Sequence, residues 1–64
     1  VELSEQEHKV LQLICEEKTV TEIGADLSLS PRYIEGIREK LIEKVGVRNS
    51  AGLVMFAVKG GLVD

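Results

Sequence analysis

Apolar residues recur at three- and four-residue spacings through the middle of the chain, which is the period of an amphipathic helix. The longer stripe consists of Ile34, Ile37, Leu41 and Val45, and a shorter stripe before it consists of Ile23 and Leu27. The few residues between the two stripes leave room only for a tight turn. The pattern therefore predicts a short helix over 20–27 and a longer helix over 31–45.

Polar residues mark where each of these two helices begins. Thr19 is followed three positions later by Glu22, which is the spacing of a capping box. Ser30 is an N-cap residue, and Pro31 follows it at the first helical position, where the missing N–H of proline costs nothing. Both helix starts are thus predicted independently of the apolar stripes.

Two helices joined by so short a turn form the pattern of a helix-turn-helix, whose second helix lies in the major groove of DNA. Gly24 follows Ile23 on the inner side of the first helix, where a side chain would hold two crossing backbones apart. Leu29 is expected to point inward from the turn. The alternative is an ordinary helical hairpin in a small bundle, and the pattern by itself leaves both interpretations open.

The flanking segments predict one further helix on each side. Ser4 and Glu7 form a second capping box, so a helix is expected to begin near Glu5 and to end at 16–18. Its predicted buried face comprises Val10, Leu11, Leu13, Ile14 and Cys15.

The last helix is expected over about 50–59, with Asn49 or Ser50 as its cap. Gly46 is a natural residue to end the preceding helix, and Val47 is expected to pack inward. The last helix should end at Gly60 and Gly61, with Leu62 and Val63 tucking back onto the core. The predicted fold class is all-α: four helices around a central helix-turn-helix, with no strands.

The length of 64 residues allows one domain with a small core, because so short a chain buries only about 60% of its unfolded surface. The single cysteine excludes an intramolecular disulfide and a cysteine-based zinc site, and it is compatible with a reducing, cytoplasmic setting. No apolar run approaches the length of a membrane span, and no signal peptide is visible. The chain begins at Val1 and not at Met, so we interpret it as a piece cut from a longer protein.

The net charge of −3 is unusual for a DNA-binding domain, which is normally basic on its working face. The distribution matters more than the total. The segment 32–48 carries five basic and three acidic residues, whereas the rest of the chain carries three basic and eight acidic residues. The basic charge is therefore concentrated on the second helix of the motif and just after it.

An ordered series of short motifs runs along nearly the whole chain. It comprises Leu3-Ser4-x-x-Glu7-x-x-Val10-Leu11, Thr19-x-x-Glu22-Ile23, Leu27-x-Leu29-Ser30-Pro31-Arg32, Ile34-Glu35, Lys44-Val45-Gly46-Val47-Arg48-Asn49 and Ala51-x-Leu53-Val54. This series resembles the LuxR-type, or GerE-like, helix-turn-helix domain that forms the C-terminal half of NarL/FixJ-type response regulators. Tyr33 departs from the family pattern, in which threonine is usual.

The resemblance implies a four-helix DNA-binding domain of a bacterial transcription regulator, acting as the effector of a two-component response regulator. In the family such a domain usually follows a phosphorylatable receiver or a ligand-binding domain, and no cofactor is expected.

The residues opposite the buried stripe of the helix over 31–45 are the candidates for contact with double-stranded DNA. Glu35, Gly36 and Glu39 are expected nearest the base edges, because the N-terminal half of a recognition helix reads them. Arg38 and Lys44 could instead pair with neighbouring acids. The candidates for phosphate contact are Thr21, Ser30, Arg32, Tyr33, Arg38, Lys40, Lys44 and Arg48.

The helix over 50–59 is apolar nearly all round and is a candidate surface for self-association. Gly52, Met55 and Val58 are expected to face solvent, and the resemblance implies a homodimer that reads two half-sites through this helix. The alternatives are that these apolar residues are incidental or that they contact a missing upstream domain.

An enzyme would need a constellation of reactive side chains, and His8 and Cys15 are the only nucleophile–base pair. Seven residues separate them, which is about 10 Å along a helix, whereas a working pair needs about 3 Å. No phosphate-binding loop or metal-ligand spacing is present, so the chain is predicted not to be an enzyme.

Besides a transcription regulator, a protein-interaction module with the same fold and a sigma-factor region-four-like promoter reader remain open. The apolar fourth helix favours the LuxR type over the sigma type.

Overall fold

The computed structural model describes residues 2–60, and these form four helices. They are α1 (Glu5–Cys15), α2 (Val20–Leu27), α3 (Pro31–Val45) and α4 (Ser50–Lys59). The predicted all-α class is confirmed, as are the predicted bounds of the helices, except that α1 ends at Cys15, just before the predicted 16–18. The expectations for Gly61, Leu62 and Val63 lie outside the described residues.

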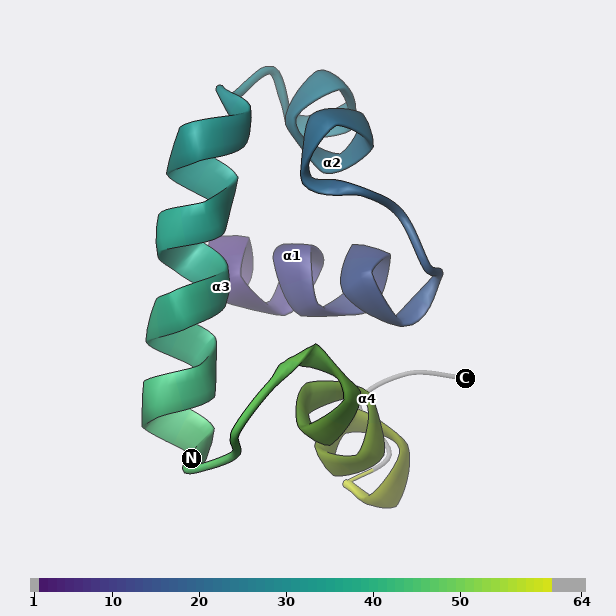
Figure 1. The fold of residues 1–64 in the computed structure, drawn as a ribbon, viewed down its shortest axis with the longest axis vertical. Coiled ribbons are helices and arrows are strands. Elements are labelled where there is room, and N and C mark those ends of the chain that lie inside the picture. The colour runs from purple at the N-terminus through teal and green to yellow at the C-terminus, as the bar shows by residue number, and fades with distance from the viewer. Residues whose placement is uncertain (1, 61–64) are drawn as a thin grey trace.

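α3 stands along one edge of the molecule and organises the other helices (Figure 1). α2 lies beside its N-terminal end, α4 lies beside its C-terminal end, and α1 crosses behind its middle. One long side of α3 therefore faces the core, and the opposite long side carries no other helix.

The predicted caps begin all four helices. Ser4 and Thr19 each form a complete capping box, in which the side-chain oxygen accepts from the N3 amide and the glutamate accepts from the cap amide. The Ser30 hydroxyl accepts from the Tyr33 amide at 3.1 Å ahead of Pro31. Asn49, one of the two candidates for the last cap, accepts from the Gly52 amide at 3.0 Å. These local bonds satisfy amides that the first helical turn leaves without partners.

Every helix contributes to one small apolar core. The predicted stripe of α3 is buried except at its last residue, Val45, which is partly buried. Leu13 and Cys15 were predicted on the buried face of α1 but are also only partly buried. The fully packed core consists of Val10, Leu11, Ile14, Ile23, Ile34, Ile37, Leu41, Leu53 and Ala57.

The turn between α2 and α3 fixes the geometry of the motif. Ser28 adopts a left-handed conformation with φ 58°, and the Leu29 amide donates to the Gly24 carbonyl at 2.8 Å. Gly24 is buried, and a Cβ atom there would run into the carbonyl oxygen of Leu29. The prediction that Gly24 permits close packing is confirmed, but its partner is the backbone of the turn, not a crossing helix.

The turn between α3 and α4 uses the other predicted glycine. Gly46 ends α3 in the left-handed conformation with φ 80°, and its amide donates to the Ile42 carbonyl at 2.9 Å. Val47 packs against the core, as predicted. The chain then passes through Arg48 to the cap of α4, which places Arg48 just beyond the C-terminal end of α3.

Candidate nucleic-acid interface

The side of α3 that points away from the other helices is accessible to a ligand. Its residues are all exposed, as their spacing from the buried stripe predicts, and they are Arg32, Glu35, Gly36, Glu39, Lys40 and Glu43. Since the buried stripe anchors the helix, this face is presented on a rigid element. It is the part of the domain best suited to enter a groove of DNA.

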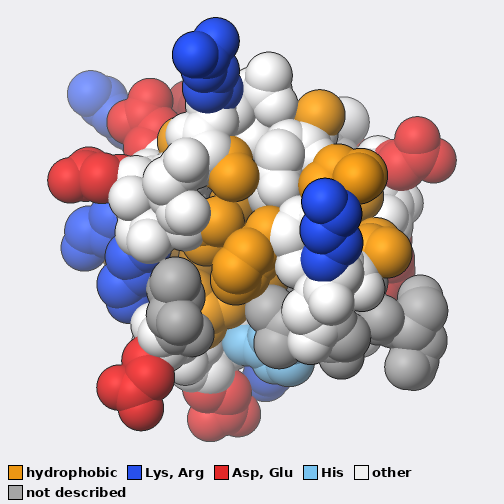
Figure 2. Space-filling view, turned by 90° about the horizontal axis from the view of Figure 1, so that it is seen from below, with side chains coloured by type: hydrophobic (Ala, Val, Ile, Leu, Met, Phe, Trp, Pro, Cys, Tyr) orange, Lys and Arg blue, Asp and Glu red, His pale blue; other side chains and the backbone are white. Residues whose placement is uncertain are grey.

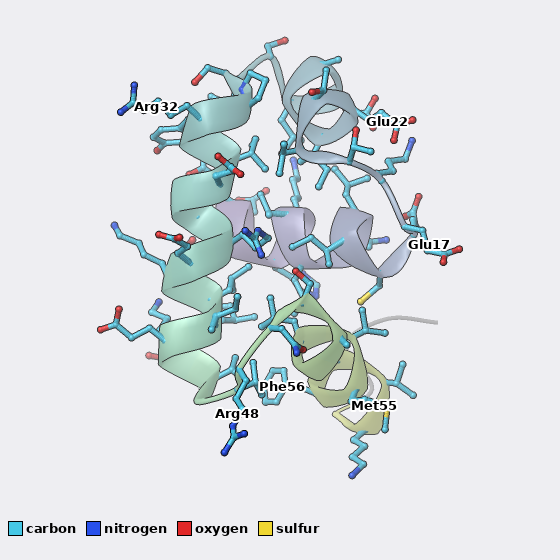
Figure 3. The ribbon with its side chains drawn as sticks, in the orientation of Figure 1. Glu17, Glu22, Arg32, Arg48, Met55 and Phe56 are labelled. Carbon is cyan, nitrogen blue, oxygen red and sulfur yellow. The ribbon has the colours of Figure 1, made fainter. Side chains whose placement is uncertain are left out.

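Arg32 lies at the N-terminal end of this face and Arg48 lies beyond its C-terminal end, and both side chains are exposed. Figure 3 shows the two guanidinium groups pointing away from the body of the molecule, one at the N-terminal end of α3 and one past its C-terminal end. Within residues 2–60, neither makes an ion pair or a side-chain hydrogen bond. Both are therefore available to bind anions.

Two other predicted phosphate contacts, Ser30 and Thr21, are exposed near the starts of α3 and α2. The Ser30 oxygen accepts a bond from the Tyr33 amide, which leaves its hydroxyl proton available to donate to a phosphate oxygen. Thr21 lies in the first turn of α2, where helix amides point outward.

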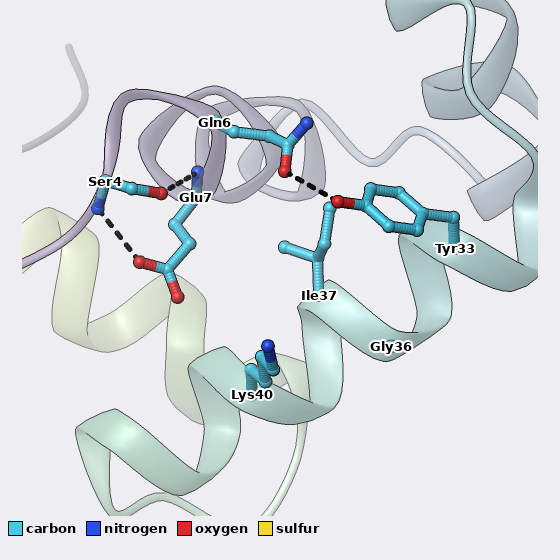
Figure 4. A pocket seen from close by; sticks show the side chains of 7 residues that line it. All are labelled: Ser4, Gln6, Glu7, Tyr33, Gly36, Ile37 and Lys40. Carbon is cyan, nitrogen blue, oxygen red and sulfur yellow. Dashed lines mark hydrogen bonds between the residues drawn. The ribbon is translucent and has the colours of Figure 1, made fainter.

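Tyr33 leans toward α1 and does not project straight outward. Its hydroxyl donates to Gln6 Oε1 at 3.3 Å, although half of the side chain remains exposed. Beside it lies a hollow of about 410 Å³ between α1 and α3 (Figure 4). We call it the α1–α3 hollow, and its lining residues are Ser4, Gln6, Glu7, Tyr33, Gly36, Ile37 and Lys40. Gln6 thus lies at the edge of the candidate interface. The pattern of residues within the first helix does not indicate this position for Gln6.

Lys44 and Arg38 make contacts within the domain. Lys44 Nζ lies 2.8 Å from Glu7 Oε1 and 3.3 Å from the Glu2 carbonyl oxygen. Arg38 is partly buried and donates to Ser50 Oγ at 3.2 Å. Lys44 therefore takes the alternative of pairing with an acid, whereas Arg38 joins α3 to the start of α4 through a hydroxyl.

Glu7 is the acid that anchors α1 to α3. Its side chain is almost fully buried, and it accepts from Lys44 Nζ and from the Ser4 amide at 2.9 Å. The hydrogen bond from Lys44, reinforced by the Ser4 amide, holds the pKa of Glu7 below its ordinary value of 4.5. The lowered pKa means that the folded state favours the ionised carboxylate.

Replacing Glu7 with glutamine is expected to cost about 1 kcal/mol of unfolding free energy at neutral pH. Because the pKa is lowered in the folded state, this contribution exists above pH 4.5 and is lost as the pH falls through the lower folded value. Urea unfolding at a series of pH values from 7 downward should show the variant and the parent chain converging as the pH falls below 4.5.

Glu5→Gln is the matched control for this substitution. Glu5 also lies in the first turn of α1, but its side chain is exposed and its pair with Lys9 is long, at 4.0 Å. Its removal should change stability by less than about 0.5 kcal/mol. An equal loss in the two variants would show that the bond to Lys44 adds nothing beyond the charge at the start of the helix.

The outer side of α4 carries an exposed apolar stripe of Ala51, Met55 and Val58, which we call the α4 stripe. Met55 and Val58 are 55% and 59% exposed, as predicted. Gly52 was predicted to face solvent beside them, and this is wrong. The Val47 side chain covers it, because an added Cβ would lie 2.7 Å from Val47 Cβ. Ala51 takes the place assigned to Gly52, and its four-residue spacing from Met55 could have indicated this.

Figure 2 shows the molecule from the end at which α4 and the C-terminal end of α3 lie. Hydrophobic side chains gather on this face, with lysine or arginine side chains beside them. Figure 3 places Met55 on the outside of α4, whereas Phe56 lies toward the end of α3. The exposed apolar side chains of α4 thus lie at one end of the molecule, apart from the exposed face of α3.

The two reactive residues singled out from the sequence, His8 and Cys15, both lie on α1, about 10 Å apart along its axis. His8 and Cys15 are both half-buried. Burial, together with the nearby Glu16 charge, raises the pKa of the Cys15 thiol, which disfavours the nucleophilic thiolate. Among residues 2–60, no three His, Cys, Asp or Glu side chains cluster as a metal site would require. None of the four helices combines the length and the apolar character needed to cross a bilayer.

Comparisons with known proteins agree with this geometry. Residues 1–57 match the GerE family model, described as bacterial regulatory proteins of the luxR family. The chain is 30% identical over 62 residues to the response regulator UvrY of Escherichia coli strain K12, and 32% identical over 62 residues to the response regulator GacA of Pseudomonas aeruginosa. Each match covers 97% of this chain but only 28% and 29% of the respective relative.

The fold is similar to the solved structure of the transcription factor GerE. The TM-score is 0.90, the sequence identity is 19%, and the match covers 97% of this chain and 92% of that one. At this identity the likeness concerns the arrangement of the helices and not the residues on their surfaces.

Proposed function

The chain belongs to the luxR family of bacterial regulatory proteins, and from this premise we propose that it binds double-stranded DNA with α3 in the major groove. In this proposal it acts by binding alone, without catalysis, in the control of transcription. The observation that carries the proposal is the exposed face of α3, which a helix-turn-helix holds away from the other three helices.

The charges at the ends of α3 support this orientation. The major groove is about 12 Å wide and is bordered by two phosphate backbones. α3 has 15 residues and is therefore about 22 Å long, so its ends can reach both borders. Arg32 and Arg48 lie at these ends and can bind phosphates, while the N-terminal half of α3 meets base edges. Thr21, Ser30, Tyr33 and Lys40 are placed to add contacts, and Arg38 and Lys44 contribute less because they are engaged within the domain.

We further propose that two copies pair through the α4 stripe and read two half-sites. Met55 and Val58 expose apolar surface that a second copy would bury.

The chain spans less than a third of the response regulators UvrY and GacA. An upstream receiver domain in the same polypeptide and a cytoplasmic location are therefore part of the proposal. The match through residue 57, which includes most of α4, weakens the alternative of a sigma-like promoter reader.

Replacing Arg48 with alanine tests the phosphate contacts. Each phosphate contact that is lost should lower the magnitude of the slope of log K against log salt by about 1. The expected result is weaker binding to all duplexes, with a correspondingly shallower slope. The measurement is a titration of labelled duplex DNA with the chain at several salt concentrations.

Lys9→Ala provides the charge-matched control, since Lys9 is exposed on α1, is not among the predicted phosphate contacts and pairs only weakly with Glu5. It should leave the slope unchanged. If both variants bind like the parent chain, Arg48 makes no phosphate contact. If the parent chain binds no duplex even at low salt, the protein-interaction alternative replaces DNA binding.

A further inference from the structure

The exposed face of α3 carries a row of carboxylates where a DNA-binding helix usually carries cations. Glu35, Glu39 and Glu43 follow one another at four-residue spacing, and all three are exposed. We call them the acidic stripe. Within residues 2–60, none of the three makes an ion pair or a side-chain hydrogen bond.

The cations of the same helix do not neutralise this stripe. Lys44 bonds to Glu7, Arg38 bonds to Ser50, and Lys40 lines the α1–α3 hollow. Arg32 and Lys40 share the outward face with the carboxylates, and neither makes an ion pair with them. The segment 32–48 has a positive net charge, but the middle of the exposed face of α3 is dominated by carboxylates. The positive charges of Arg32 and Arg48 lie at the two ends of this helix.

This charge profile restricts which base edges the proposed groove helix can accept. In the major groove, guanine presents two acceptors and thymine presents one acceptor beside a methyl group. Adenine presents a donor next to an acceptor, whereas cytosine presents a donor alone. An ionised carboxylate accepts hydrogen bonds and cannot donate them. Cytosine is thus the one base that offers a carboxylate a donor without an adjacent repelling lone pair.

The spacing of the first two carboxylates sets the distance between the bases they reach. Positions four apart on a helix are separated by about 6 Å along its axis, and base pairs are about 3.4 Å apart. Gly36 lies between them, and nothing stands within 4 Å of the position where its Cβ would be. The bare backbone there lets the helix approach the groove floor closely.

We propose that Glu35 and Glu39 determine specificity, each by accepting a hydrogen bond from a cytosine amino group at positions about two base steps apart. The same carboxylates repel sequences that present acceptors there, so they sharpen discrimination and weaken non-specific binding. This inference rests on the proposed function, since it names the bases that α3 reads.

The test is selection of duplexes from a randomised library by the whole chain, followed by sequencing, for the parent and for three glutamine variants. Glutamine keeps the length of the side chain, removes its charge and favours adenine through a paired donor and acceptor. Glu35→Gln and Glu39→Gln should each lose cytosine enrichment at one position, by about fivefold or more, and gain adenine there. The two affected positions should differ.

Glu43→Gln is the matched control, because it removes the same charge from the next turn, farther from the base-reading end. It should leave the selected sequence unchanged. All three variants should bind an unselected duplex more tightly than the parent chain, by roughly three- to fivefold.

The outcomes separate the inference from the function on which it rests. Selection of a defined sequence without cytosine at two such positions, or the same change of sequence in all three variants, would overturn the inference while DNA binding stood. Enrichment of no duplex by the parent chain would overturn both.

Discussion

Replacing Gly24 with alanine is expected to lower the free energy of unfolding by about 2 kcal/mol or more. A Cβ atom at this position would meet the carbonyl oxygen of Leu29, and it would lie 3.4 Å from the nitrogen of Pro31. Both are backbone atoms, one in the turn between α2 and α3 and the other in the first residue of α3, so no side-chain rotation relieves the clash. A domain of 64 residues is stable by roughly 3–10 kcal/mol, so the loss is a large fraction of the total.

Gly36→Ala is the control for this prediction. Gly36 is also in the interior of a helix, but it is exposed and has open space at its Cβ position. Alanine there should raise stability by about 1 kcal/mol through helix propensity alone. Urea unfolding followed by circular dichroism measures both changes. Equal stabilisation by the two substitutions would mean that the turn adapts freely and that Gly24 does not fix its geometry.

Replacing Met55 with glutamate is expected to abolish cooperative binding of two copies to DNA with two half-sites, at a cost of up to about 100-fold in affinity for the paired complex. The side chain is 55% exposed, so the fold of one copy should persist. A paired α4 stripe would have to desolvate the new carboxylate on each copy, which is strongly unfavourable. Binding to a single half-site should change far less.

Sedimentation of the free chain and of its complex with DNA that contains two half-sites measures the number of bound copies. Gln12→Glu introduces the same charge at an exposed position of α1 and should leave pairing intact. Unchanged cooperative binding by Met55→Glu would exclude the α4 stripe as the pairing surface.

Helix bounds could be predicted from the sequence because the signals that set them are local. The capping boxes at Ser4 and Thr19 and the cap before Pro31 involve residues only three positions apart. The buried stripe of α3 follows from helical periodicity, and the same periodicity places its exposed face.

Contacts between helices could not be predicted in the same way. The Lys44–Glu7 pair joins residues 37 positions apart, and the Tyr33–Gln6 bond joins residues 27 positions apart. Neither has a signature in the pattern of its own helix. The error at Gly52 has the same origin, because Val47 covers it only after the turn that precedes α4 folds back. The sequence already marked Arg38 and Lys44 as residues that could be engaged within the domain, but only the structure identifies their partners, Ser50 and Glu7.

NMR titration of the isotope-labelled chain with duplex DNA would show whether α3 enters the major groove. Backbone amide shifts report which residues lie at the interface. If α3 lies in the groove, the largest changes should fall on its N-terminal half, from Arg32 to Glu39, with a second group at Arg48. Changes centred on α1 or α4 that spare this half of α3, or no changes at low salt, would contradict this position of α3.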